Sequence, residues 1–336
     1  MDGPALQADG SQDGSFGSLD LTLDAVFVSD VESIDVEFIV DAPANGETSP
    51  GCRDQTLTWD SNPSLWKAES VAFSPDGQFL AATIQKAGRI WRVADGAMTA
   101  FNDPCVMGGM SSVSYFPDGN SLAAASCGAV FTIWTGGVFK TRLDDVSSLY
   151  AISPDGATVA TRYGDTLLKV VKIATDETLF TITSPDVEWA LAFSPDGTEL
   201  ASGNADATVR LWDARSGDAL ATLAAGAAVM SRGLAISPSG KLVAALSTAG
   251  IELWSMEDRQ PAGTIAVDPL ATEFAFTPDS KSIIAGGASV GVYSVADLRL
   301  LYQMGERTYA VAVSPDGTRV AATGDTQQSL NLYCLR

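Results

Sequence analysis

Histidine is absent from the 336-residue chain, and basic residues are scarce, with 20 Lys and Arg against 41 Asp and Glu. Without histidine the chain cannot build a Ser/His/Asp or Cys/His nucleophile, a His general acid or base, or an imidazole metal site. The net charge of −21 repels the phosphates of nucleic acids and anionic lipid headgroups. We therefore expect no nucleic-acid partner, no metal and no cofactor.

Long apolar runs are missing too. No window reaches the roughly 18 apolar residues that a membrane-spanning helix needs, so we expect no transmembrane segment. Met1–Pro4 lack the basic and apolar regions of a signal peptide. Residues 1–17 are rich in Asp, Gly, Ser and Gln and cannot bury enough apolar surface to offset their ordering entropy, which predicts a flexible acidic tether.

A proline turn, in contrast, recurs every 37 to 43 residues along the chain. Its prolines are Pro75, Pro117, Pro154, Pro195, Pro238, Pro278 and Pro315. The fullest copies read Ser-Pro-Asp-Gly, as at residues 194–197. Proline presets φ at the second turn position, Asp accepts a local backbone hydrogen bond, and Gly adopts a conformation that is costly for other residues. Each copy therefore predicts a hairpin.

Four short apolar segments surround each turn, for example residues 191–194, 199–202, 208–212 and 219–223. Four strands with a period of about 40 to 45 residues are typical of a propeller blade. We therefore predict an all-β, seven-bladed β-propeller. Val209–Asp213 ends in a Trp-Asp pair, and on this motif and the period the chain resembles the WD40-repeat family over about residues 55 to 336. The family's Gly-His dipeptide is absent because the chain has no histidine.

The seventh repeat ends at Arg336 after only three strands. WD40-like rings borrow the missing strand from the N-terminus, and the resemblance implies that Gln55–Trp59 closes the last blade. Residues 52–336 would then form one closed ring. The innermost strands alternate small and bulky side chains, which predicts that each blade presents a bulky face to one neighbour and a small face to the other. The small residues are Ala72, Ser114, Ala151, Ala192, Ala235, Ala275 and Ala312.

Residues 18–51 contain two stretches with period-two alternation, Leu19–Leu23 and Val36–Val40. Such alternation predicts two strands. We expect an accessory β-hairpin followed by a linker; the alternative is the remnant of a separate small module.

The four cysteines, Cys52, Cys105, Cys127 and Cys334, show no CxxC spacing. Cys52 precedes the closing strand and Cys334 ends the strand with which it should pair, so both lie at one end of that blade. Cys105 and Cys127 fall in two loops on one face of the second blade. We therefore favour two disulfides, Cys52–Cys334 and Cys105–Cys127, over four free thiols.

Two disulfides favour a periplasmic, cell-surface or extracellular protein, with a lipoprotein as one form of anchoring. The alternative is a cytoplasmic protein of a salt-adapted organism. It would explain the 30 Asp and only 7 Lys by the need to keep the surface soluble.

Propellers bind partners at the mouths of the ring. Five residues before the Ser or Thr of each turn, or before Phe116 in the second blade, the repeat places Glu69, Ser111, Ser148, Trp189, Arg232, Thr272 and Tyr309 at one mouth. Adjacent loops add Trp66, Met107, Met110 and Met230. Trp, Tyr and Arg are enriched in binding hot spots. The predicted partner site consists of Trp66, Glu69, Met107, Trp189, Met230, Arg232, Thr272 and Tyr309. The alternative is structural: Trp189 and Tyr309 cap the core between blades, and Arg232 pairs with a local carboxylate.

Enzymatic propellers require features that this sequence lacks. Sialidase-like enzymes need an arginine cluster and Ser-x-Asp boxes on outer strands, and quinone-dependent propellers need several charged contacts around a stacking Trp. We therefore expect a noncatalytic, monomeric scaffold that binds a protein or peptide. The alternative is a small-ligand-binding or cryptically catalytic envelope propeller, which would need a polar pocket with converging carboxylates and an arginine at a mouth.

Overall fold

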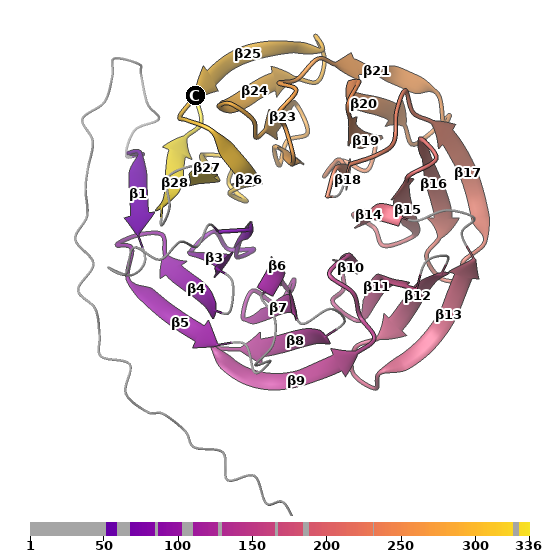
Figure 1. Ribbon diagram of the computed structural model, residues 1–336, viewed down its shortest axis with the longest axis horizontal. Helices are drawn as coiled ribbons and strands as arrows, with labels where there is room; N and C mark the ends of the chain where they lie inside the picture. The colour runs from indigo at the N-terminus through magenta and orange to yellow at the C-terminus, as the bar shows by residue number, and fades with distance from the viewer. Residues whose placement is uncertain are drawn as a thin grey trace, which may run out of the picture. The chain divides into compact units, whose positions relative to one another are not determined.

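The computed structural model describes residues 52–58, 68–84, 87–102, 110–126, 130–164, 167–183, 188–230, 232–324 and 329–336. All regular structure in these residues is β-strand, in seven four-stranded antiparallel sheets. Figure 1 shows the sheets arranged as the blades of a ring, with one edge strand of each sheet next to the central axis. The predicted seven-bladed all-β propeller is confirmed. The predicted tether and accessory hairpin lie outside the described residues.

Blades 1 to 3 are each built from four consecutive strands, given from the axis outward. Blade 1 consists of β2 (Ser70–Phe73), β3 (Phe79–Ile84), β4 (Ala87–Arg92) and β5 (Met98–Asn102). Blade 2 consists of β6 (Met110–Tyr115), β7 (Ser121–Ser126), β8 (Val130–Thr135) and β9 (Val138–Asp144). Blade 3 consists of β10 (Tyr150–Ile152), β11 (Thr158–Tyr163), β12 (Leu167–Lys172) and β13 (Glu177–Thr183).

Blades 4 to 6 follow the same order, whereas blade 7 takes its outer strand from the other end of the chain. Blade 4 consists of β14 (Glu188–Phe193), β15 (Glu199–Asn204), β16 (Thr208–Asp213) and β17 (Ala219–Ala224). Blade 5 consists of β18 (Leu234–Ile236), β19 (Leu242–Ser247), β20 (Gly250–Ser255) and β21 (Pro261–Ile265). Blade 6 consists of β22 (Phe274–Phe276), β23 (Ser282–Ala285), β24 (Val290–Ser294) and β25 (Arg299–Met304). Blade 7 consists of β26 (Thr308–Val313), β27 (Arg319–Gly324), β28 (Ser329–Cys334) and β1 (Gln55–Thr58).

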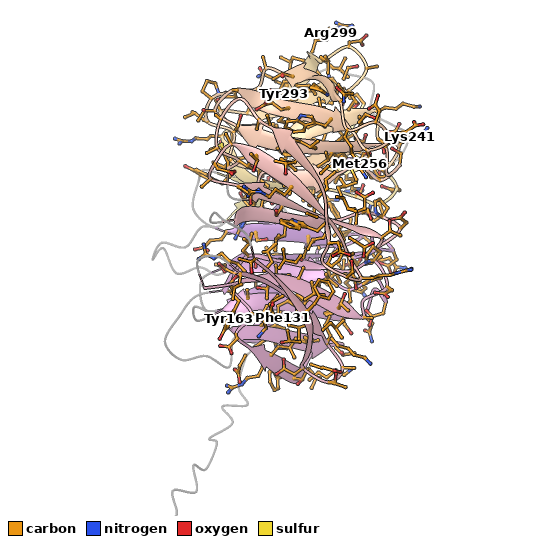
Figure 2. All side chains as sticks on the ribbon, turned by 90° about the vertical axis from the view of Figure 1, so that its right-hand side faces the viewer. Phe131, Tyr163, Lys241, Met256, Tyr293 and Arg299 are labelled. Atoms are coloured by element: carbon orange, nitrogen blue, oxygen red, sulfur yellow. A yellow bond between two sulfur atoms is a disulfide. The ribbon has the colours of Figure 1, made fainter. Side chains whose placement is uncertain are left out.

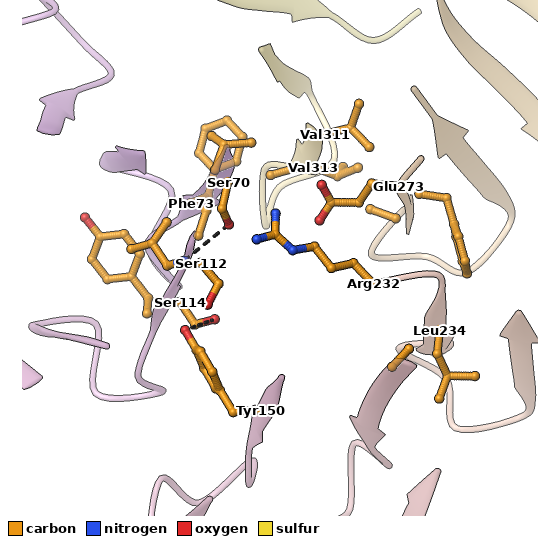
Figure 3. A pocket seen from close by; sticks show the side chains of 18 of the residues that line it. Ser70, Phe73, Ser112, Ser114, Tyr150, Arg232, Leu234, Glu273, Val311 and Val313 are labelled. Carbon is orange, nitrogen blue, oxygen red and sulfur yellow. Dashed lines mark hydrogen bonds between the residues drawn. The ribbon is translucent and has the colours of Figure 1, made fainter. Parts of the chain in front are cut away.

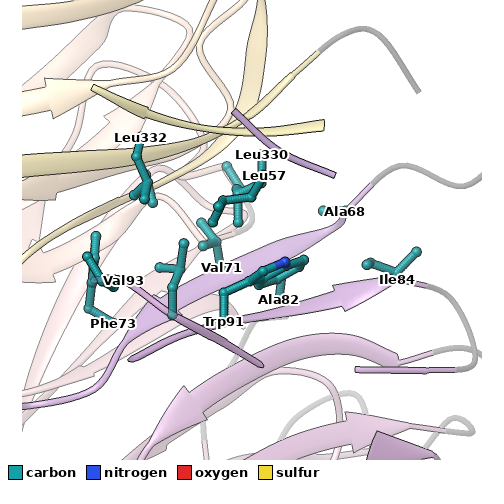
Figure 4. Packing of buried hydrophobic residues seen from close by; sticks show 13 residues of the cluster. Leu57, Ala68, Val71, Phe73, Ala82, Ile84, Trp91, Val93, Leu330 and Leu332 are labelled. Carbon is teal, nitrogen blue, oxygen red and sulfur yellow. The ribbon is translucent and has the colours of Figure 1, made fainter. Parts of the chain in front are cut away.

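The seam of the ring is the antiparallel pairing of β1 with β28, in which Leu57 lies opposite Leu330. Both leucines are fully buried in the core between blades 7 and 1, as Figure 4 shows. A disulfide joins Cys52 to Cys334 at the end of this pair. The predicted closing strand and the first predicted disulfide are therefore confirmed. Cys105 and Cys127 lie outside the described residues.

Apolar clusters fill the space between consecutive blades. On β2, Val71 and Phe73 pack with Leu332 of blade 7, while Ala72 between them packs with Val113 of blade 2. Successive side chains of a strand point to opposite faces, so one strand serves both interfaces. This confirms the predicted alternation of a bulky and a small face.

The proline turns connect the first and second strands of the blades, and those at Pro75, Pro154, Pro195, Pro278 and Pro315 share one hydrogen-bond pattern. In blade 1 the Ser74 hydroxyl donates to the Asp76 carboxylate at 2.5 Å and accepts from the Phe79 backbone N–H at 2.9 Å. Gly77 has φ +70°, the left-handed conformation that glycine tolerates best. The hydrogen bond from Ser74, followed by one from the Gln78 backbone, holds the pKa of Asp76 below its usual value.

These turns define one mouth of the ring, which we call the Pro-turn mouth. Figure 2 views the ring edge-on: Lys241, beside the turn at Pro238, lies on one side, and Tyr163, at the far end of β11, lies on the other. The opposite mouth contains the residues just before or at the start of the innermost strands, and we call it the loop mouth. Its residues are Glu69, Ser111, Ser148, Trp189, Arg232, Thr272 and Tyr309.

Candidate functional site

Arg232 crosses the loop mouth from blade 5 to the opposite side of the ring. One guanidinium nitrogen donates to the Glu69 carbonyl oxygen at 2.6 Å, and the other terminal nitrogen donates to the Ser111 carbonyl oxygen. Glu69 directly precedes β2, the innermost strand of blade 1, and Ser111 is the second residue of β6, the innermost strand of blade 2. The structure therefore brings the predicted site residues Glu69 and Arg232 together, through a backbone acceptor.

The acceptors of Arg232 are neutral. No carboxylate among the described residues lies within ion-pair distance of its guanidinium group. The predicted alternative, in which Arg232 pairs with a local carboxylate, is therefore not what the described residues show. A guanidinium bound only to neutral carbonyls retains its capacity for a charged acceptor, which forms stronger hydrogen bonds.

Backbone hydrogen bonds on both sides of Arg232 hold it over the mouth. The Met230 N–H donates to the Leu246 carbonyl of blade 5 at 2.8 Å, and the Gly233 N–H donates to the Met230 carbonyl at 2.9 Å. A Cβ at Gly233 would lie only 2.9 Å from the Met230 carbonyl oxygen and from Leu246, so only glycine fits. Arg232 itself has φ +62°, which is costly for a residue with a side chain.

Thr272 and Tyr309 form a second contact at this mouth, between blades 6 and 7. The Thr272 hydroxyl donates to the Tyr309 carbonyl at 2.7 Å, and the Arg307 guanidinium lies 5.2 Å from the centre of the Tyr309 ring. Both Thr272 and Tyr309 are partly exposed. The structure therefore places them at the mouth with accessible surface.

The other predicted site residues divide into two groups. The Met230 side chain is partly buried and packs against the core between blades 5 and 6, so it contributes mainly to that core. Trp66 and Met107 lie outside the described residues, and for Trp189 only the backbone within β14 is described. The role of all eight residues in partner binding stays a prediction.

A cavity of about 470 Å³ occupies the channel beneath Arg232. Figure 3 shows Arg232 and Glu273 projecting into it from one side, with Ser112, Ser114 and Tyr150 across from them. The Tyr150 hydroxyl donates to the Ser114 hydroxyl at 3.3 Å. Bulky apolar side chains complete the wall: Val71, Phe73, Leu149, Leu191, Leu234, Phe274, Phe276, Val311 and Val313.

Glu273 is the carboxyl group of this cavity, and its surroundings favour the neutral form. Burial raises its pKa to about 7, although the charge of Arg232 and a hydrogen bond from the Val311 backbone oppose that rise. Burial likewise raises the pKa of Glu69 at the mouth, again against the charge of Arg232. A carboxyl group that titrates near neutrality inside a cavity is typical of functional sites.

Sequence reasoning missed Glu273, although the repeat contains the signal. The signal is the position four residues before the first residue of each turn; that first residue is Ser or Thr in six blades and Phe116 in blade 2. The residues at this position are Ser70, Ser112, Leu149, Ala190, Gly233, Glu273 and Ala310. Glu273 is the only charged residue in this column. In the repeat, Glu273 lies one residue further from the loop mouth than the position that Thr272 and Arg232 occupy. This position would have predicted that Glu273 lies inside the channel.

A second hollow, of about 640 Å³, lies at the Pro-turn mouth between the turns at Pro195 and Pro238. Glu199, which pairs with Arg259 at 2.7 Å, is one of its charged lining residues, together with Asp196, Lys241 and Glu257. In the channel, Arg232 and Glu273 project into one cavity without an ion pair between them. We therefore take the channel as the candidate ligand site.

Among the described residues, no three His, Cys, Asp or Glu side chains are grouped to hold a metal ion. No helix in the described part of the chain is long and apolar enough to cross a membrane.

Comparison with known families finds a match within the described propeller. Residues 177–213 match the family described as "WD domain, G-beta repeat". The matched segment runs from β13 to the end of β16, across the junction of blades 3 and 4. No curated protein matches the chain significantly.

Proposed function

We propose that this propeller of WD40-type blades is a noncatalytic, monomeric scaffold that binds a protein or peptide at its loop mouth. WD40 propellers generally bind proteins. The observation that carries the proposal is that the residue at the loop mouth varies from blade to blade of a closed ring and includes Arg232 and Tyr309. Tyr and Arg are residue types that dominate binding energy at protein interfaces.

The rigidity of the mouth supports this proposal. Arg232 connects blade 5 to blades 1 and 2, and Thr272 connects blade 6 to blade 7. Groups that are ordered before binding lose less conformational entropy when a partner docks. A ring held in this way suits recognition of a partner without rearrangement.

For the compartment we propose the cell envelope or the extracellular space. The Cys52–Cys334 disulfide supports this assignment, because structural disulfides persist in oxidising compartments. The alternative of a cytoplasmic protein in a salt-adapted organism rests on the acidic composition, and it predicts free thiols.

Selection of peptides from a displayed random library would test the proposed mouth. Peptides selected on the wild-type protein should bind the double variant Thr272→Ala, Tyr309→Ala at least tenfold more weakly, as loss of a central aromatic contact commonly costs more than about 1.4 kcal/mol. The matched control is Leu179→Ala, Leu220→Ala, two exposed residues of the outer strands β13 and β17. Equal affinity for all three proteins would contradict the proposal.

Binding of a small ligand is a second candidate function, and the channel cavity favours it. The cavity contains an arginine and a carboxyl group that converge near one mouth, which is the arrangement such a function requires. The two candidate sites share Arg232, which lies at the mouth and also lines the cavity, whereas Thr272 and Tyr309 belong only to the proposed partner site.

A further inference from the structure

We propose that the channel binds a small molecule that carries a carboxylate on an apolar body, with Arg232 as its cationic partner and Glu273 as a hydrogen-bond donor. This inference rests on the second candidate function, and its test is separate from the test of the scaffold role. It assigns the cavity of about 470 Å³ a ligand class. Pockets of this size are typical of small-molecule sites.

The charged groups of the cavity determine which charge a ligand can carry. Arg232 stays protonated at any physiological pH and would oppose a bound cation under all conditions. Glu273 can become neutral, because burial raises its pKa to about 7. An anion is therefore the only charged ligand that the cavity can accept without a permanent like charge beside it.

The donors match a carboxylate rather than a neutral acceptor. Arg232 now donates to two backbone carbonyls, those of Glu69 and Ser111. A carboxylate that replaces them would gain two parallel charge-assisted hydrogen bonds, while the released carbonyls at the mouth could be hydrated. Protonated Glu273 would add a donor beside Arg232, and the Ser112 hydroxyl could add one from the facing wall.

The remaining wall explains why the ligand should have an apolar body. Below the level of Arg232, the lining includes Leu191, Leu234, Phe274 and Val311. Burying apolar ligand surface against such side chains contributes roughly 25 cal/mol per Å². A benzoate-like molecule would place its ring here and its carboxylate toward the mouth.

Among the described residues, the other titratable groups that line the cavity or its mouth keep one charge state near neutral pH or lie at the mouth, so Glu273 sets the pH dependence of binding. Tyr150 of blade 3 and Tyr115 of blade 2 have pKa values raised by burial, so both stay neutral. Arg232 of blade 5 stays charged, and Glu69 of blade 1 lies at the mouth with its pKa raised. An anion should therefore bind more tightly as Glu273 becomes protonated, that is, as the pH falls below about 7.

Titration calorimetry of the full chain with benzoate would test the site, with benzamide and benzylamine as neutral and cationic probes of the same shape. Benzoate should bind about tenfold more tightly at pH 6 than at pH 8, because a group with a pKa of about 7 is mostly protonated at the first and mostly ionised at the second. Benzamide and benzylamine should bind at least tenfold more weakly than benzoate at pH 6.

Variants connect this binding to the two residues. Arg232→Met should weaken benzoate at least tenfold. Glu273→Gln should keep binding at pH 6 and reduce its change between pH 6 and pH 8 to less than twofold. The matched control is Arg259→Met, since Arg259 is in the same blade with the same φ of +62° but binds Glu199 at the Pro-turn mouth. Its affinity for benzoate should equal that of the wild type.

Preferential binding of benzylamine or benzamide would overturn the assignment of a carboxylate while leaving a small-ligand site in place. Absence of binding by all three probes would overturn both. If Arg232→Met does not fold, as judged by its thermal melting, Glu273→Gln alone decides: an unchanged pH dependence in that variant would contradict the proposal. Neither result affects the test of the scaffold function with displayed peptides.

Discussion

The two mouths of the ring are built in opposite ways. At the Pro-turn mouth the same residues recur, with a Ser or Thr hydroxyl bonded to an Asp carboxylate in the turns at Pro75, Pro154, Pro195, Pro278 and Pro315. At the loop mouth the equivalent position is a different residue in almost every blade. Repetition indicates a shared structural requirement, whereas variation leaves side chains available for recognition.

Contacts between blades strengthen the Pro-turn mouth further. A Cβ at Gly156 would lie 3.3 Å from the ring of Pro117 in the preceding blade, and one at Gly197 would lie 3.5 Å from Pro154. The disulfide lies at this mouth as well, because Cys334 pairs with Arg319 directly after the turn at Pro315. The comparison therefore predicts that changes at the Pro-turn mouth lower stability and changes at the loop mouth lower binding.

Removal of the disulfide should cause the largest loss of stability at the Pro-turn mouth. Replacing Cys52→Ser and Cys334→Ser together should lower the free energy of unfolding by about 2–4 kcal/mol, because the bridge restricts a very long loop in the unfolded chain. Guanidinium denaturation of the double variant and of the wild type would measure the change. Affinity for benzoate, measured where both proteins are folded, should stay the same.

Mass spectrometry after alkylation of free thiols provides the control for this prediction. The oxidised wild type should contain the Cys52–Cys334 bridge and, as the sequence predicts, a Cys105–Cys127 bridge. Four alkylated thiols in protein purified without reductant would contradict the disulfides and remove the main support for an envelope or extracellular location.

A substitution in a single proline turn, the one at Pro195, should cause a smaller loss of stability. The buried Ser194 hydroxyl donates to Asp196 at 2.6 Å and accepts from the Glu199 backbone N–H at 2.9 Å. Ser194→Ala should lower the free energy of unfolding by about 1–2 kcal/mol, because it leaves that N–H without its partner. Ser216→Ala is the control in the same blade: Ser216 is exposed, and its loss should change stability by less than about 0.5 kcal/mol. Equal effects of the two substitutions would contradict a stabilising role of the repeated turn.

The fold was predictable because its signals are local and repeated. Each proline turn specifies a hairpin through residues within five positions of one another, as the bonds of Ser74 to Asp76 and Phe79 show. The missing fourth strand of blade 7 then required a partner from the N-terminus, and β1 pairs with β28 as predicted. The match of residues 177–213 to the WD repeat agrees with the resemblance seen in the sequence.

The site was predictable only in part, because its contacts cross the ring. The column of residues identified Arg232, but nothing local indicates that its guanidinium reaches the carbonyls of Glu69 and Ser111, more than a hundred residues away in sequence. The titration of Glu273 near neutrality depends on burial created by several blades at once. Properties of this kind arise from the closed ring and cannot be derived from one repeat.

The central claim is that partners bind the loop mouth and not the Pro-turn mouth. The most direct measurement is photo-crosslinking in the native host with a photoreactive residue at Tyr309, compared with the same residue at Lys241, which is exposed beside the turn at Pro238. The account predicts a discrete crosslinked product from position 309 and none from position 241. A product from position 241 alone would contradict it and would assign recognition to the repeated mouth.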